Sequence, residues 1–169
     1  FLWVHLFDAH ERYLEHPGIR FGKGKAALYD GEIAFVDQQL GELYDGIGKS
    51  PRAGKVTWIV HGSQGEGLGE HDFTGHGGDL YEEVMRVPLV IAAADGKPGR
   101  HTAPVSTLDL GATIIDLAGA EAEGLSGVSL APIARGELAR PHGPVYARSP
   151  RRAALIEWPL KLMVIEKKK

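Results

Sequence analysis

The sequence predicts an α/β fold in which helices flank a mostly parallel central sheet, with a β-hairpin at the C-terminal end. Two observations support this prediction. Short, continuous apolar runs alternate with helical segments that have one apolar face, which is the usual order in strand–helix–strand folds. The 169 residues, of which 43% are hydrophobic and 24% charged, can also bury one core of ordinary size.

The composition excludes several classes of protein. The chain has no Cys, which removes disulfide scaffolds, thiolate metal sites and cysteine nucleophiles. Its 19 basic and 22 acidic side chains give a net charge of −3, so we expect no nucleic-acid partner. None of its apolar runs reaches the roughly 20 residues that a membrane span requires, and we expect no membrane segment.

The first half of the chain contains three predicted elements. The mostly apolar residues Phe1–Phe7 predict a buried strand. A domain seldom begins on a core strand, so we expect the chain to be a piece of a longer protein. Apolar residues at alternating steps of three and four predict a helix over Lys25–Ile47, and glycine, serine and proline residues follow it. A second apolar strand is predicted over Lys55–Val60.

The elements of the second half follow one another at short intervals. Ser106 and Asp109 form a Ser-x-x-Asp signal, which predicts the start of a helix that runs to about Leu117. A short helix is predicted over Leu80–Met85, and a third strand over Val87–Ala93. Short strands near Val145 and Leu155 and a longer one over Leu160–Ile165 predict a closing hairpin.

Two loops are candidate functional segments, because ligands of open α/β sheets lie beyond the carboxyl ends of the strands. The first loop contains His10, whereas His5 alternates with apolar neighbours and is interpreted as a core residue. The second loop, residues 61–78, holds seven Gly, three His and three acidic residues. Imidazole and carboxylate groups bind divalent metals and anionic esters, although composition alone also fits a solvated loop. The glycine spacing does not match a phosphate-binding or dinucleotide-binding loop.

Several motifs occur in a characteristic order: Phe1–His10, Tyr29–Asp37, Gly65–His71, Gly75–Gly77, Leu80–Glu83, Arg86–Leu89, Pro104–Leu117 and Gly127–Leu130. In this order they resemble the second half of a sulfatase of the alkaline-phosphatase-like superfamily. The resemblance covers nearly the whole chain but not the whole family domain. It implies that residues 1–169 are a single partial domain, the C-terminal portion, whose partner is the missing N-terminal half.

The resemblance implies hydrolysis of sulfate monoesters. In the family the nucleophile is a formylglycine made from the first residue of a Cys/Ser-x-Pro-x-Arg motif, and a calcium ion holds the sulfate. No such motif occurs in these 169 residues, so we expect the chain to be catalytically incomplete on its own. Family members are often periplasmic or secreted, which is the only indication of a compartment.

Two metal-ligand positions of the family fall in the second loop. The family pattern Ser/Thr-Asp-His/Asn-Gly-Glu aligns with Gly65 and Glu66, which places Ser63 at the position of the Asp and Gln64 at that of the His or Asn. Gln64 offers an amide oxygen, but Ser63 offers a neutral hydroxyl in place of a carboxylate. Because calcium affinity depends strongly on ligand charge, we expect a degenerate site for calcium or another divalent metal.

Two histidines match substrate-side positions of the family. His10 matches the His that contacts the ester near its leaving group, and His76 matches the position where a Lys or His meets the anionic group. Both are therefore candidate catalytic and substrate-binding residues for a sulfate ester or a related anionic substrate. Glu66, Glu70 and His71 are expected to support the loop.

Three functions remain open from the sequence. The first is a sulfatase portion with a degenerate metal site, in effect a pseudoenzyme with little or no sulfatase activity. The second is an active phosphodiester hydrolase or phosphoglycerol transferase of the same superfamily with a different metal set. The third is a non-catalytic module that binds anionic or sulfated ligands.

Overall fold

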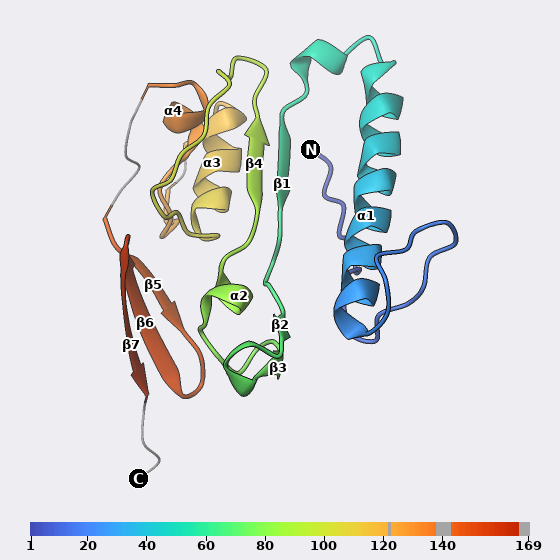
Figure 1. The fold of residues 1–169 in the computed structure, drawn as a ribbon. Coiled ribbons are helices and arrows are strands. Elements are labelled where there is room, and N and C mark those ends of the chain that lie inside the picture. Colours follow the sequence, from blue (N-terminus) through green and yellow to red (C-terminus); the bar gives the residue numbers. More distant parts are fainter. Residues whose placement is uncertain (122, 138–142, 166–169) are drawn as a thin grey trace. The chain divides into compact units, whose positions relative to one another are not determined.

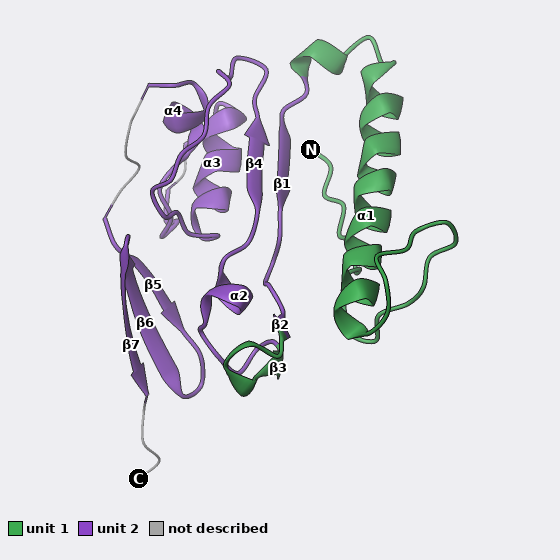
Figure 2. Ribbon diagram, viewed as in Figure 1, with its two compact units in different colours: residues 1–55, 68–75 green, residues 56–67, 76–169 purple. Residues whose placement is uncertain are grey.

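The computed structural model describes residues 1–121, 123–137 and 143–165 (Figure 1). The chain forms two compact units (Figure 2): unit 1 comprises residues 1–55 and 68–75, and unit 2 comprises residues 56–67 and 76–169. None of the helices in the described ranges is long and apolar enough to cross a membrane.

Unit 1 is built on the helix α1 (Lys25–Gly48), which confirms the helix predicted from its apolar period. The segment before the helix packs on it through aromatic rings. His16 stacks on Phe35 with ring centroids 4.0 Å apart, and Tyr13 meets Tyr29 edge-on at 5.4 Å. The loop that precedes α1 is therefore held on the helix surface.

A buried carboxylate strengthens the attachment of this loop. Glu32 lies on α1 and is only 1% exposed. Its Oε1 accepts the backbone N–H of Leu14 at 2.7 Å. An ionised acceptor makes a stronger hydrogen bond than a neutral one, so Glu32 fixes the backbone of the segment that follows His10.

Residues 1–7 differ from their prediction. They belong to no sheet in the described ranges, and their apolar side chains are largely exposed, as with Phe1 at 96% and Phe7 at 69%. The predicted strand was wrong for this structure. An apolar run suits a strand, but a strand forms only where a neighbour supplies hydrogen-bond partners, and the described residues supply none here.

Unit 2 contains the predicted second and third strands, β1 (Trp58–His61) and β4 (Leu89–Ala92). They pair antiparallel, with Trp58 opposite Ala92 and His61 opposite Leu89. The helices and strands confirm the α/β class, and the pairing of β1 with β4 is antiparallel within it. Between them the chain carries the short strands β2 (Gly67–Leu68) and β3 (Thr74–Gly75) and the helix α2 (Glu82–Met85). The apolar runs of β1 and β4 do not themselves encode strand direction.

The C-terminal strands form a three-stranded antiparallel sheet in the order β5 (Val145–Arg148), β6 (Arg152–Glu157) and β7 (Leu160–Ile165). Glu157 pairs with Leu160, so the chain turns at Trp158 and Pro159. This sheet confirms the predicted closing hairpin.

Two ion pairs attach this C-terminal sheet to the segment around α2. The Arg152 guanidinium lies 2.9 Å from the Asp79 carboxylate and 5.3 Å from the centroid of the Tyr81 ring. Lys161 on β7 donates to Glu82 at 2.7 Å. The Asp79 and Arg152 side chains are only 9% and 21% exposed, so this contact is shielded from screening by salt.

The helix α3 (Asp109–Leu117) begins at the predicted Ser-x-x-Asp signal. Asp109 is 3% exposed, and its carboxylate accepts two backbone N–H groups, from Ser106 at 2.7 Å and from Val128 at 2.9 Å. A Cβ atom at Gly127 would lie 2.1 Å from the carbonyl oxygen of Leu108, so only glycine allows this approach. The carboxylate of Asp109 thus holds both the segment before the helix and the turn around Val128 against the first turn of α3.

The short helix α4 (Ala131–Ala134) follows this turn and ends beside an exposed ion pair. Arg135 donates from Nε to the Asp95 carboxylate at 2.8 Å. This hydrogen bond holds the pKa of Asp95 below its ordinary value and raises the pKa of Arg135. Because both groups are at the surface, the pair is a minor contribution to stability.

Replacing Asp109 with Ala removes the acceptor of two backbone N–H groups and leaves both donors in a part-buried site. We expect the free energy of unfolding to fall by about 2 kcal/mol. Urea unfolding followed by circular dichroism measures the change. Asp109→Asn keeps one acceptor oxygen, so its free energy of unfolding should fall by a smaller amount. Equal decreases of the free energy of unfolding in the two variants would contradict this role.

Candidate functional site

The loop after β1 is held against α2 by its backbone. Gly62 donates to the carbonyl oxygen of Pro88 at 3.1 Å, and Gly65 donates to that of Val84 at 2.7 Å. A Cβ atom at Gly65 would lie 2.0 Å from the carbonyl oxygen of Glu83, so the loop fits in this position only with glycine. The side chains of residues 63, 64 and 66 are thereby presented from a fixed backbone.

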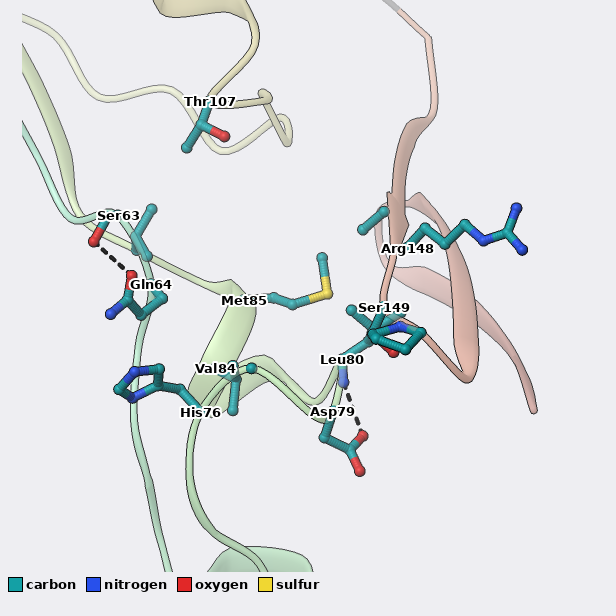
Figure 3. A pocket seen from close by; sticks show the side chains of 14 residues that line it. Ser63, Gln64, His76, Asp79, Leu80, Val84, Met85, Thr107, Arg148 and Ser149 are labelled. Atoms are coloured by element: carbon teal, nitrogen blue, oxygen red, sulfur yellow. Dashed lines mark hydrogen bonds between the residues drawn. The ribbon is translucent and has the colours of Figure 1, made fainter. Parts of the chain in front are cut away.

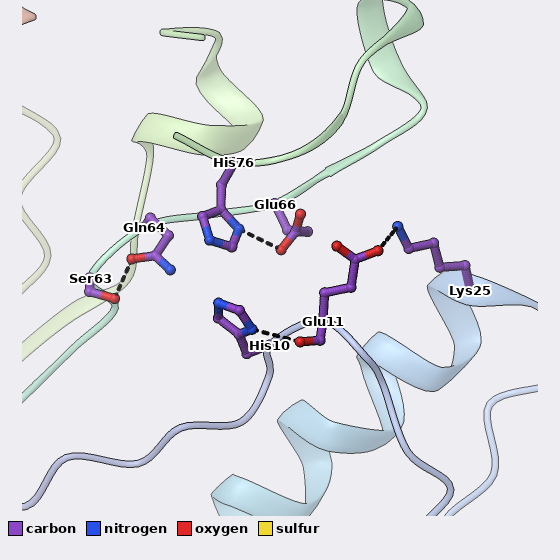
Figure 4. A network of polar contacts seen from close by, with 7 residues as sticks. All are labelled: His10, Glu11, Lys25, Ser63, Gln64, Glu66 and His76. Carbon is purple, nitrogen blue, oxygen red and sulfur yellow. Dashed lines mark hydrogen bonds and ion pairs between the residues drawn. The ribbon is translucent and has the colours of Figure 1, made fainter. Parts of the chain in front are cut away.

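Ser63 and Gln64, the two predicted metal-ligand positions, contact each other (Figure 4). The Ser63 hydroxyl donates to Oε1 of Gln64 at 2.6 Å, and both residues are exposed. The amide oxygen that Gln64 would offer to a cation therefore accepts a hydrogen bond from its neighbour.

These two residues are poor ligands for the divalent metal that the resemblance implies. Calcium is bound by six to eight oxygens, usually including carboxylates, whereas Ser63 and Gln64 supply only neutral oxygens. Across the described ranges, no group of three or more His, Cys, Asp or Glu side chains is arranged to hold a metal ion. The residues present do not by themselves fit calcium.

His76 is paired with a buried carboxylate, that of Glu66 (Figure 4). Nδ1 of His76 lies 2.9 Å from Oε2 of Glu66, and the two side chains are 24% and 3% exposed. An ionised carboxylate only accepts, so Nδ1 carries the proton in this contact and the ring orientation is fixed. The second oxygen of Glu66, Oε1, is buried and has no hydrogen-bond partner among the described residues.

A cavity of about 420 Å³ lies beside this pair in unit 2 (Figure 3). Its lining comes from the loop after β1, the α2 segment, Thr107 and the turn between β5 and β6. The lining residues are Ser63, Gln64, His76, Gly77, Asp79, Leu80, Val84, Met85, Val87, Thr107 and Ala147–Pro150. Three of the four predicted site residues, Ser63, Gln64 and His76, thus share one cavity.

His10, the fourth predicted site residue, lies in unit 1. Its ring stacks on that of Phe7 with centroids 4.6 Å apart, and Nδ1 lies 2.8 Å from the carbonyl oxygen of Glu11. The Glu11 side chain pairs with Lys25 at 3.3 Å (Figure 4). His10 is therefore half-buried and held by local contacts within its own unit.

The sequence did not predict the partner of His76 or the walls of the cavity. Glu66 was interpreted only as a residue that supports the loop, and no periodicity links two residues ten positions apart in an irregular segment. Glu70 does support its loop, since Oε2 accepts the N–H of Leu68 at 2.8 Å. No local sequence pattern indicated that Ala147–Pro150 would line the cavity.

The fold is that of the alkaline-phosphatase-like sulfatases. The chain is similar in structure to a 2-O GAG sulfatase, with a TM-score of 0.65 over 82% of this chain and 35% of that one, at 24% sequence identity. Residues 1–120 match the family described as Sulfatase. The chain therefore belongs to the sulfatase family.

Curated relatives match parts of the sequence. Choline-sulfatase of Rhizobium meliloti (strain 1021) is 33% identical over 112 residues, which cover 64% of this chain and 22% of the relative. Delta 4,5-hexuronate-2-O-sulfatase of Bacteroides thetaiotaomicron is 29% identical over 116 residues, covering 66% of this chain and 24% of the relative. The chain thus spans about a quarter or less of the length of these relatives.

Replacing Glu66 with Ala removes the acceptor that holds the Nδ1 proton of His76. We expect the neutral ring to shift toward the tautomer protonated on Nε2, because no carboxylate then favours Nδ1–H. The ¹⁵N chemical shifts of the imidazole measure the tautomer. Glu66→Gln retains an oxygen acceptor and should keep the wild-type pattern, as should Glu70→Ala elsewhere in the loop. An unchanged tautomer in Glu66→Ala would contradict the pairing.

Proposed function

We propose that this chain is the C-terminal portion of a sulfatase-like domain that binds the anionic group of a sulfate ester through His76 but does not hydrolyse the ester on its own. The contact between His76 and the buried Glu66 carboxylate, at 2.9 Å, is the observation that supports this function best. A histidine held by a buried carboxylate at the edge of a cavity is an arrangement suited to binding an anion.

The chemistry of binding follows from the two nitrogens of the ring. Nδ1–H donates to Glu66, so protonation of the other nitrogen, Nε2, produces an imidazolium that donates from both positions. In that form, an Nε2–H that meets a sulfate oxygen makes a charge-assisted hydrogen bond with it. His76 thus supplies charge and orientation rather than a nucleophile.

Hydrolysis requires a nucleophile that these residues do not supply. The sequence contains neither Cys nor a Cys/Ser-x-Pro-x-Arg motif. We infer that residues 1–169 act together with an N-terminal portion of the same protein, which would carry the nucleophile. The exposed apolar side chains of residues 1–7 support this inference, because such a surface is usually covered by another part of the protein.

The role of His10 in contacting the leaving group remains a proposal that rests on its sequence match. Its ring is held by Phe7 and by the carbonyl oxygen of Glu11, so its position is defined within unit 1. A secreted or periplasmic location likewise follows only from the family.

We further propose that Ser63 and Gln64 bind a divalent metal too weakly to support efficient sulfatase activity. The neutral oxygens of Ser63 and Gln64, already hydrogen-bonded to each other, support this view. The same observation favours a second candidate function, a non-catalytic module that binds sulfated ligands. Turnover distinguishes the two functions, since both predict binding.

Replacing Ser63 with Asp restores a carboxylate at the metal position. We expect the affinity for calcium to rise about tenfold or more, because calcium binding strengthens with ligand charge. Isothermal titration calorimetry with calcium measures this. Ser126→Asp, at another exposed serine, adds the same charge elsewhere and should have no such effect. Equal calcium affinities in the two variants would contradict the assignment of Ser63.

Replacing His76 with Ala should weaken the binding of sulfate by about tenfold, which corresponds to the loss of one charge-assisted hydrogen bond of roughly 1.5 kcal/mol. His76→Lys should retain binding, because a Lys also fits this position in the family. His101→Ala, at an exposed loop histidine, is the matched control. Sulfate titration followed by NMR measures all three variants, and an unchanged affinity in His76→Ala would refute the proposed contact.

An activity assay of the longer protein with an aryl sulfate and calcium tests the weak metal position. We expect turnover that is slow or undetectable and that changes little when calcium is chelated. Robust, calcium-dependent turnover would overturn the proposal of a weak site while leaving membership of the sulfatase family intact.

A further inference from the structure

The cavity beside His76 points to the kind of ester that this protein accepts. We propose that it binds the organic part of a sulfate ester and selects uncharged, largely apolar alcohols, such as a phenol, over alcohols that carry a second charge. This inference rests on the proposed binding of sulfate by His76 and adds the class of the alcohol.

The cavity has the size and the polarity of a site for a small organic group. Its volume of about 420 Å³ lies within the range of ligand pockets, roughly 300–1,000 Å³. The hydrogen-bonding groups of Ser63, Gln64 and His76 gather on one wall (Figure 3). An ester whose sulfate contacts His76 would therefore place its alcohol part against the remaining walls.

These remaining walls are mostly apolar. The α2 segment contributes Leu80, Val84 and Met85, and the C-terminal sheet contributes Ala147 and Pro150. Val84 and Leu80 are each only 6% exposed, so the wall that they form is fixed by packing. Burying an apolar group against such a surface contributes about 25 cal/mol per Å², whereas a strongly hydrated group gains little there.

The charged residues of the remaining walls, Asp79 and Arg148, do not offer a charge to the alcohol part of the ester, and His76 contacts the sulfate. The Asp79 carboxylate is 9% exposed, lies 2.9 Å from the Arg152 guanidinium and accepts the N–H of Leu80 at 2.8 Å. The Arg148 guanidinium points away from the other labelled side chains of the cavity (Figure 3). A cationic or carboxylate-bearing alcohol would lose hydration in this cavity without gaining an opposite charge.

A matched set of aryl sulfates tests the inference on the full chain. The probes are inorganic sulfate, phenyl sulfate, 4-carboxyphenyl sulfate and 4-(trimethylammonio)phenyl sulfate, and calorimetry or NMR titration gives each dissociation constant. We expect phenyl sulfate to bind about tenfold more tightly than inorganic sulfate and than either charged analogue. A charged analogue that binds as tightly as phenyl sulfate would overturn the proposed selectivity.

Two variants change the size of the cavity in opposite directions. Ala147→Leu reduces the volume of the cavity. It should weaken the binding of phenyl sulfate about fivefold and leave the affinity for inorganic sulfate unchanged. Met85→Ala enlarges it and should shift the preference toward 2-naphthyl sulfate. Tyr146→Leu, at an exposed neighbour of Ala147 on β5, is the control and should change neither probe. Circular dichroism verifies that each variant is folded.

The outcomes separate this inference from the proposed function. Binding of inorganic sulfate without any preference for phenyl sulfate overturns the selectivity and leaves the role of His76 intact. An absence of binding for all four probes overturns both. If Ala147→Leu fails to fold, the shift expected for Met85→Ala decides the question, and an unchanged preference in that variant counts against the proposal.

Discussion

The ion pair between Arg152 and Asp79 determines much of the arrangement in unit 2. It joins the C-terminal sheet to the segment that leads into α2, and these two parts are far apart in the sequence. Both side chains are largely removed from water, so each depends on the other for compensation of its charge. Because α2 and the turn between β5 and β6 both line the cavity, this contact holds together two parts of its lining.

The elements that could be predicted from the sequence are those defined by local signals. The apolar period of α1 and the Ser106–Asp109 signal of α3 both lie within one helix or its first turn, and both predictions were confirmed. The direction of β4 relative to β1 and the state of residues 1–7 depend on partners distant in the chain. No local pattern encodes such partners, which is why the direction was not predicted and the strand over residues 1–7 was predicted wrongly.

The same distinction applies to the candidate site. The loop of residues 61–78 was predicted from its histidines, acids and glycines, and three of its predicted residues line one cavity. The pairing of His76 with Glu66 and the wall at Ala147–Pro150 could not be predicted. The first depends on how an irregular loop folds back, and the second on the docking of a sheet about 70 residues further along the chain.

The buried Glu66 carboxylate also has a consequence for how an anion would approach. A protonated His76 and an ionised Glu66 together carry no net charge, and the whole chain is weakly acidic at −3. Long-range attraction of a sulfate ester is therefore small, and recognition depends on contacts made after the ligand has lost its water. Association should accordingly be slower than in electrostatically steered sites, and it should respond little to ionic strength.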